Sequence, residues 1–262
     1  QNEMITLFDV PSSAPSKSWS GNVWKTRICL NYKKIPHQTS WIEYPDIEPT
    51  MKKYNIGPTG TKPRDGSPIY TIPAILVTDD TTGEIKLALA ESLAIAKYLD
   101  DAYPDTPRIF PEGVTAEDQL KAAQSLLRSL RPVLVLSYKA STLLLTERSR
   151  AHANRARAGD LYHIYGKDTL DEIELSPEDE TSLWAQTKEG FDAIDAGLGQ
   201  EENGPWYLGE KFSFVDIALG AVFTYLKKAF GENSERWQDI EKWNGGRWKR
   251  FMGRLEPYTN VY

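Results

Sequence analysis

The spacing of apolar residues changes near the middle of the chain, and this change limits the fold more than any other feature. Before about residue 104, short alternating segments typical of strands are interleaved with segments of helical spacing. After about residue 113, only helical spacing recurs. The sequence therefore predicts two unlike domains, an α/β domain over residues 1–106 and an all-α helical bundle over residues 107–262.

In the first half, alternating and apolar runs predict strands, and the last two strands form a hairpin across a turn-rich segment. The predicted strands are 5–10, 38–42, 74–77 and 85–88, and the predicted helices are 23–34 and 89–103. Prolines end both helices, because proline lacks the N–H that a helix interior needs. The segment between the second strand and the hairpin is predicted to be a long loop.

In the second half, five helical segments are predicted. They are 116–145, 147–158, 177–198, 214–230 and 235–252. Pro132 is predicted to kink the first segment without ending it, and Gly245-Gly246 is predicted to break the last one.

Composition excludes several classes of function. With 31 Lys and Arg against 37 Asp and Glu, the net charge is −6, so we expect no nucleic-acid partner. No run of about 18 apolar residues and no signal-peptide pattern is present, so we expect a cytoplasmic protein without a membrane partner. The single cysteine, Cys29, excludes internal disulfides and thiolate zinc sites, and the three scattered histidines predict no metal site.

The segment Thr71-Ile72-Pro73 is the first candidate binding feature, because a proline precedes an apolar strand there. In one interpretation the proline is simply tolerated at the start of a strand. In the other, the Ile72-Pro73 bond is cis and the backbone of Ile72 is free to pair with a peptide-like ligand.

Glu91-Ser92 is the second candidate, at the start of a predicted helix. It is either an ordinary N-cap or a site for an amino-acid head group. In the second interpretation, the helix amides and the Ser92 hydroxyl bind a carboxylate, and Glu91 accepts from an ammonium.

The third candidate is the serine-rich loop 11–22 before the first predicted helix. Turn and capping chemistry explains most such serines. A serine at a helix N-terminus also donates well to a bound thiolate. No histidine lies nearby in the sequence, so a nucleophilic Ser-His pair has no local support.

These three features, together with the capping-box segment Ser213-Phe214-Val215-Asp216, resemble the cytosolic glutathione transferases over nearly the whole chain. The resemblance implies a thioredoxin-like N-terminal domain followed by an all-helical C-terminal domain. The segment Gly57 to Pro63, followed by Tyr70-Thr71-Ile72-Pro73, is similar to the serine-type, etherase-related FuA class of basidiomycete fungi.

The resemblance also implies how glutathione binds as the co-substrate. It assigns the thiol to Ser20, with Asn22 as the next candidate, the γ-glutamyl end to Glu91 and Ser92, and the cysteinyl backbone to Ile72 beside Pro73. The usual family segment is expanded here by residues 64–68. Lys62, Tyr70 or backbone groups of Thr71 and Ile72 are therefore alternatives for the glycine carboxylate.

The same resemblance implies a homodimer that acts on small hydrophobic aromatic ligands, including lignin-related or wood-derived compounds, with peroxide reduction or thiolysis as side activities. Trp19 and Trp24 are predicted to line the substrate pocket or to pack in the core. The alternatives are a ligandin-type carrier of polyphenols and a purely structural subunit. Cys29 is predicted to be an inert packing residue within a helix.

Overall fold

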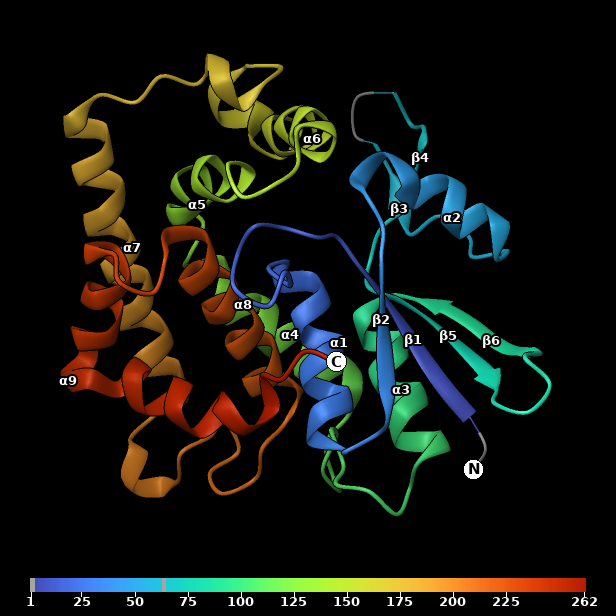
Figure 1. The fold of residues 1–262 in the computed structure, drawn as a ribbon. Helices are drawn as coiled ribbons and strands as arrows, with labels where there is room; N and C mark the ends of the chain where they lie inside the picture. The colour runs from blue at the N-terminus through green and yellow to red at the C-terminus, as the bar shows by residue number, and fades with distance from the viewer. Residues whose placement is uncertain (1–2, 63–64) are drawn as a thin grey trace.

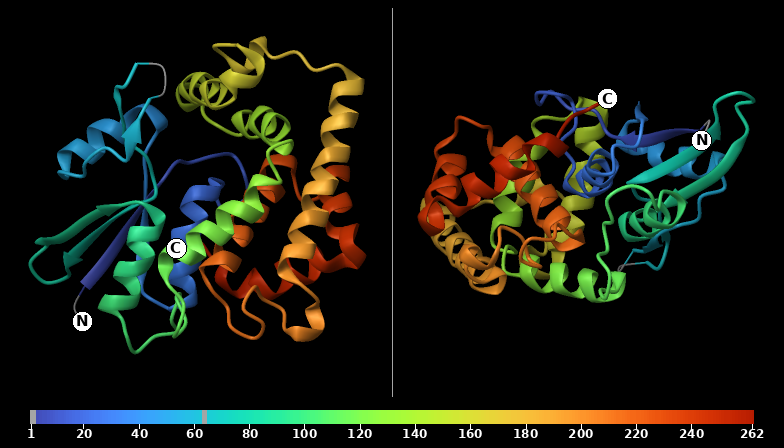
Figure 2. Two further views of the ribbon diagram at one scale, coloured as in Figure 1. Left: turned by 180° about the vertical axis from the view of Figure 1, so that it is seen from behind. Right: turned by 90° about the horizontal axis from the view of Figure 1, so that it is seen from below.

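The computed structural model describes residues 3–62 and 65–262. A small mixed sheet with its helices lies beside a larger all-helical half (Figures 1 and 2). The predicted α/β and all-α architecture is confirmed. Pro63 and Arg64, which belong to the two distinctive segments noted in the sequence, lie outside the described residues.

The main sheet has four strands in the order β2-β1-β5-β6. Its strands are β1 (Glu3–Asp9), β2 (His37–Trp41), β5 (Ala74–Asp79) and β6 (Ile85–Ala90). β1 and β2 are parallel, and the β1-β5 and β5-β6 pairs are antiparallel. All four predicted strands and the predicted hairpin are confirmed.

Two helices of the α/β half contact one another, α1 (Gly21–Tyr32) and α3 (Ser92–Ala102). α3 begins three residues later than predicted. The reason is that Leu89 and Ala90 continue β6, where they pair with Ile75 and Ala74.

The prediction of a structureless long loop before the hairpin was wrong. The segment contains η1 (Tyr44–Asp46), α2 (Ile47–Lys53), β3 (Gly60–Thr61) and β4 (Pro68–Ile69). These elements have two to seven residues, and such short elements give no periodic pattern over a sequence window.

The helical half contains α4 (Ala116–Arg128), α5 (Val133–Thr142), α6 (Glu147–Tyr165), α7 (Pro177–Leu198), α8 (Phe214–Phe230) and α9 (Glu235–Leu255). Pro132 separates two helices instead of kinking one, because residues 129–132 form a turn before α5. α6 continues past the predicted end to Gly166, which adopts a left-handed conformation. The break in α9 is confirmed and covers Trp243 to Gly246.

The predicted capping box at the start of α8 is present and buried. The Oδ2 atom of Asp216 accepts hydrogen bonds of 2.9 Å from both the backbone N–H and the hydroxyl of Ser213. Its Oδ1 atom accepts from the N–H of Tyr207 at 2.8 Å. The carboxylate thereby satisfies the amide of the N-cap residue, which helix geometry leaves unpaired, and also ties the preceding loop at Tyr207 to the start of α8.

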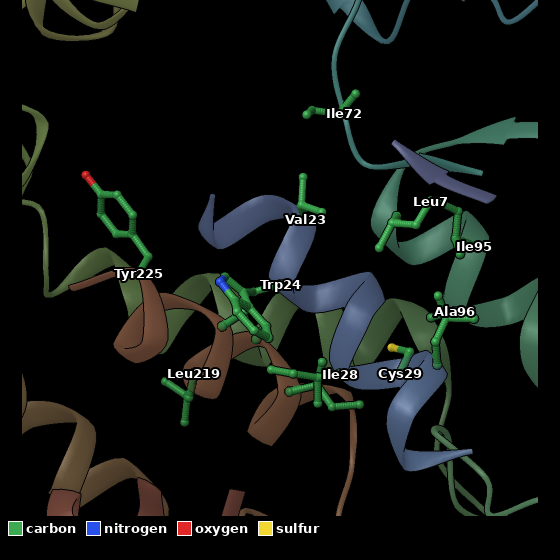
Figure 3. Packing of buried hydrophobic residues seen from close by; sticks show 14 of the residues in the cluster. Leu7, Val23, Trp24, Ile28, Cys29, Ile72, Ile95, Ala96, Leu219 and Tyr225 are labelled. Carbon is green, nitrogen blue, oxygen red and sulfur yellow. The ribbon is translucent and has the colours of Figure 1, made fainter. Parts of the chain in front are cut away.

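One hydrophobic core joins the two halves along the contact between α1 and α8. Trp24 and Ile28 of α1 lie beside Leu219 of α8 in this contact (Figure 3). Gly21 permits the close approach, since a Cβ atom there would lie 3.2 Å from the Cβ of Tyr225. The start of α1 is therefore held against the helical half.

Candidate functional site

The predicted site features come together at one edge of the main sheet. β1 ends at this edge and leads through the serine-rich loop to Ser20. Because β5 is antiparallel to both of its neighbours, it begins at the same edge, just after Pro73, and β6 ends there, just before Glu91. Topology thus gathers three features that are separated by up to 71 positions in the sequence.

The Ile72-Pro73 peptide bond is cis, in agreement with the second interpretation of that segment. The backbone N–H of Glu91 donates to the carbonyl of Pro73 at 3.3 Å, which joins this segment directly to the start of α3. The hydroxyls of Thr59 and Thr71 lie 2.8 Å apart and form a hydrogen bond. This contact joins the residue just before β3 to the segment that contains the cis bond.

Glu91 precedes α3 with φ of 79°, a left-handed conformation that residues other than glycine adopt at a cost of about 1–3 kcal/mol. Within the described residues, its side chain makes no capping hydrogen bond to the helix. The ordinary N-cap interpretation therefore does not account for Glu91. The backbone amides in the first turn of α3 and the carboxylate of Glu91 are therefore both available to a ligand at the start of this helix.

Ser20 is the N-cap residue of α1, and the residue is 6% exposed. Its carbonyl accepts from the N–H of Trp24 at 2.9 Å. As with Glu91, the described structure contains no capping hydrogen bond from its side chain. The hydroxyl therefore lies at the positive end of a 12-residue helix without a capping role.

Asn22, the next candidate for binding the thiol, is exposed, and its side chain pairs with a lysine of the same helix. Its Oδ1 atom accepts from the ammonium of Lys25 at 3.1 Å.

Lys25 is a site residue that sequence reasoning missed. Burial lowers the pKa of Lys25, and the negative charge of Glu91 acts in the opposite direction. A cation thus interacts with both the first turn of α1 and the carboxylate at the start of α3. The only signal in the sequence was a lysine just after the first turn of the helix.

The two tryptophans near Ser20 are both buried in the core that joins the two halves, and Trp19 is 2% exposed. Trp24 is 1% exposed and packs in the contact between α1 and α8, as the core interpretation predicted. Trp19 lies 6.1 Å from the ring of Tyr225 and 6.3 Å from the ring of Tyr44, measured between centroids. Trp19 is therefore part of an aromatic contact between the two halves.

Arg157 of α6 extends this aromatic contact. Its guanidinium lies 4.9 Å from the centroid of Tyr138 and donates to the hydroxyl of Tyr44 at 3.4 Å. It also forms an ion pair with exposed Asp160, three residues further along the same helix. We name Trp19, Tyr44, Tyr138, Tyr225 and Arg157 the aromatic cluster.

Polar contacts hold α6 to the α/β half beside the aromatic cluster. Glu43 accepts from the hydroxyls of Thr146 and Ser149, and Arg148 forms a two-point ion pair with Asp46. These contacts fix the position of Tyr44, which lies between Glu43 and Asp46 in the sequence.

Lys62 and Tyr70, the candidates for the glycine carboxylate, directly follow β3 and β4, the part of the α/β half drawn nearest to α6 in Figure 1. Lys62 is exposed. The pKa of His152 on α6 is lowered mainly by burial, and further by the positive charges of Arg155 and Lys62. The ammonium of Lys52 lies 5.4 Å from the ring centroid of Tyr70. Lys62 thus offers an exposed cation of its own, whereas the cation nearest to the Tyr70 ring is Lys52.

Cys29 is fully buried in α1, and burial raises the pKa of its thiol. The thiolate is the nucleophilic form, so the burial of this thiol agrees with the packing role predicted for Cys29. Across the described ranges, no three His, Cys, Asp or Glu side chains are grouped as metal ligands, and no helix is both long and apolar enough to span a membrane.

Two family models match this chain. Residues 19–102 match the N-terminal domain of glutathione S-transferase, and residues 120–258 match its C-terminal domain. A curated relative, the glutathione S-transferase-like protein ustS of Aspergillus flavus, is 32% identical over 256 residues, which cover 94% of this chain and 87% of that protein.

Solved structures of basidiomycete proteins are also similar. Glutathione transferase GSTFuA3 of Phanerochaete chrysosporium is 34% identical with a TM-score of 0.83, and the match covers 100% of both chains. The glutathione S-transferase CsGST63524 of Ceriporiopsis subvermispora, solved in complex with glutathione, is 33% identical with a TM-score of 0.83 over 98% of both chains.

Proposed function

This chain belongs to the glutathione S-transferase family, and we propose that it uses the Ser20 hydroxyl to activate the thiol of glutathione for attack on hydrophobic aromatic electrophiles. The observation that carries this proposal is the position of Ser20, at the N-terminus of α1 and on the same sheet edge as Ile72 and Glu91. Its hydroxyl performs no capping role in the described structure.

Glutathione would bind along this edge in an extended form. Glu91 accepts from the γ-glutamyl ammonium, while the first-turn amides of α3 and the Ser92 hydroxyl bind the neighbouring carboxylate. The cysteinyl backbone pairs with that of Ile72, in the manner of strand addition. Lys62 then binds the glycine carboxylate, because its ammonium is exposed on the side facing α6.

The energetic requirement is modest. A free thiol with a pKa of about 8.5 is about 3% thiolate at pH 7, and lowering the pKa by two units raises this to about 75% at a cost of about 2.7 kcal/mol. A hydroxyl that donates to the sulfur and the positive end of α1 act in this direction. The thiol proton leaves to solvent.

With an aryl chloride, the thiolate sulfur forms a bond to the ring carbon, and the C–Cl bond breaks to release chloride with its electron pair. Flat substrates would contact the half-buried rings of the aromatic cluster, Tyr44 and Tyr138, of which Tyr44 lies against Trp19, the residue that precedes Ser20. A homodimer remains a prediction.

The Ser20→Ala variant tests this function with 1-chloro-2,4-dinitrobenzene. Loss of the hydroxyl should return the bound thiol toward its free pKa and lower kcat at pH 7 about 25-fold, while the calorimetric Kd for glutathione changes less than about twofold. Ser13→Ala, in an exposed position of the same loop, is the matched control.

An unchanged kcat at saturating glutathione would exclude Ser20 as the activating group. Tight binding of aromatic compounds by the wild-type protein without consumption of glutathione would instead favour the carrier.

A further inference from the structure

Ser20 begins its helix differently from four other serine and threonine residues of this protein. Ser176 and Ser234 each accept a hydrogen bond from the backbone N–H three residues later, at 3.0 and 3.1 Å, and so cap α7 and α9. Thr115 and Thr146 cap α4 and α6 in the same way. In the part of the chain that the structure describes, the Ser20 side chain makes no such bond to α1. Because capping stabilises a helix, another contact must hold Ser20 away from it.

The backbone of Ser20 is rotated relative to that of the capping residues. Its ψ angle is 118°, whereas ψ lies between 149° and 161° in the four residues that cap α4, α6, α7 and α9. This angle sets where the side chain lies relative to the amides of the first turn. The Ser20 hydroxyl is thereby kept from the N–H of Val23, the amide that it would otherwise cap.

Ser18 fixes the chain just before this position. It is fully buried, and its hydroxyl donates to Oδ2 of Asp9 at 2.7 Å. The same Asp9 oxygen accepts from the guanidinium of Arg27 at 2.9 Å, and Oδ1 accepts from the backbone N–H of Val10 at 2.8 Å. Ser18 is therefore anchored to a carboxylate that β1 and α1 already hold in place.

The two residues before Ser18 have a strained backbone. Ser16 and Lys17 have φ angles of 68° and 62°, in the left-handed region that is costly for residues other than glycine. Such a conformation persists only where its surroundings determine it. The hydroxyl of Ser12 donates to the carbonyl of Lys17 at 2.8 Å on one side, and the Ser18 bond restrains the other. Loss of the Ser18 bond would let this segment relax, and Ser20 would move with it.

We propose that Ser18 is a positioning residue for the glutathione reaction, because its bond to Asp9 holds Ser20 in the rotated conformation and keeps the Ser20 hydroxyl available to the glutathione sulfur. This inference rests on the proposed role of Ser20. Without the bond, Ser20 turns into the ordinary capping geometry, and the N–H of Val23 fixes its oxygen over the first turn of α1. The sulfur then loses its hydrogen-bond donor, while Ser18 itself does not contact glutathione.

The Ser18→Ala variant tests this role through the ultraviolet absorbance of the bound thiolate, followed across a pH titration. The pKa of the bound thiol should rise by about one unit, which lowers the thiolate fraction at pH 7 from about 75% to about 25%. The kcat with 1-chloro-2,4-dinitrobenzene should fall about threefold, and the Kd for glutathione should change less than about twofold.

Ser213→Ala is the matched control, because it also removes a bond from a buried serine hydroxyl to a buried aspartate, at the start of α8. It should leave the pKa of the bound thiol unchanged. If Ser18→Ala alone does not fold, Lys17→Gly is added to it, since glycine adopts a φ of 62° at little cost. The double variant is then compared with Lys17→Gly, and the same rise in thiol pKa is expected.

A Ser18→Ala/Ser20→Ala variant separates positioning from a general structural role. If Ser18 acts through the Ser20 hydroxyl, adding Ser18→Ala to Ser20→Ala should change neither kcat nor the thiol pKa any further. A further threefold loss of kcat would overturn the proposal. An unchanged thiol pKa in Ser18→Ala would overturn it too, because the packing of Trp19 would then suffice to hold Ser20. That result would leave the proposed function intact, since Ser20→Ala alone decides it.

Discussion

Arg27 of α1 and Asp9 at the end of β1 form an ion pair of 2.9 Å in which both side chains are completely buried. The same Asp9 oxygen accepts from the hydroxyl of Ser18 at 2.7 Å, and Arg27 also donates to Thr39 of β2 at 2.9 Å. Ser18 lies two residues before Ser20. The pair thus ties the sheet, α1 and the serine-rich loop together at the proposed catalytic position.

Replacing Asp9 with Asn should lower the free energy of unfolding by about 3–5 kcal/mol, because the charge of Arg27 would stay buried without its partner. Urea denaturation measures this loss. Glu48→Gln, which breaks the exposed pair between Glu48 and Lys52, is the control and should leave the free energy of unfolding almost unchanged, because solvent screens that pair. Similar losses in the two variants would show that burial does not decide the strength of the Asp9 pair.

Glu91→Gln tests the assignment of the γ-glutamyl ammonium. Removing the charge should weaken glutathione about tenfold by calorimetry, since a hydrogen bond between charged groups contributes about 1.5–3 kcal/mol. The kcat at saturating glutathione should change little, because Glu91 does not contact the sulfur in the proposed binding mode. Glu84→Gln, exposed in the turn between β5 and β6, should behave as wild type. An unaltered Kd in Glu91→Gln would remove Glu91 from the site.

Arg157 should determine how strongly the protein prefers a negatively charged electrophile over a neutral one. The Arg157→Leu variant should raise KM for 4-chloro-3,5-dinitrobenzoate about tenfold and leave KM for its methyl ester unchanged, since only the acid offers the guanidinium a counter-charge. Arg128→Leu, an exposed cation at the end of α4, is the control. Equal effects on acid and ester would mean that Arg157 only supports the packing of Tyr44 and Tyr138.

Two glycines in helices should respond oppositely to alanine. A Cβ atom at Gly190 of α7 would lie 2.3 Å from the carbonyl oxygen of Ser129, so Gly190→Ala should lower the free energy of unfolding by about 2 kcal/mol or more. At Gly159 of α6, no atom of the described residues lies within 4 Å of that position, apart from the chain neighbours and nearby backbone of the same helix. Gly159→Ala should therefore raise the free energy of unfolding by about 0.4–1 kcal/mol. Both values come from urea denaturation, and a stable Gly190→Ala would contradict the close approach of α7 to Ser129.

Sequence periodicity was informative where an element is long or has one buried face. α7 and α8 were predicted with their observed bounds, and the break in α9 followed from Gly245-Gly246. Short elements such as α2 were missed. Pro132 was misjudged because a kinked helix and a pair of helices have the same apolar spacing.

In the candidate site too, some features were predictable from the sequence and others were not. Local chemistry in the sequence offered the cis Ile72-Pro73 bond as one of two interpretations, and it singled out the Glu91-Ser92 pair and the serine before α1 as candidates. The contributions of Lys25 and Tyr44 were not predicted. Each depends on a partner distant in sequence, Glu91 for Lys25 and Trp19 and Arg157 for Tyr44.

The sequence by itself determined the two kinds of secondary structure, their order and the residue types able to bind an amino-acid head group and a thiol. These follow from periodicity, capping and backbone preferences, which act over a few neighbouring residues. Tertiary structure alone decided which side chains meet. The antiparallel pairing of β5 places Pro73 and Glu91 on one edge, and the packing of α1 on α8 brings Trp19 against Tyr225 and buries Trp24. Such contacts join residues far apart in the chain, so no local pattern encodes them.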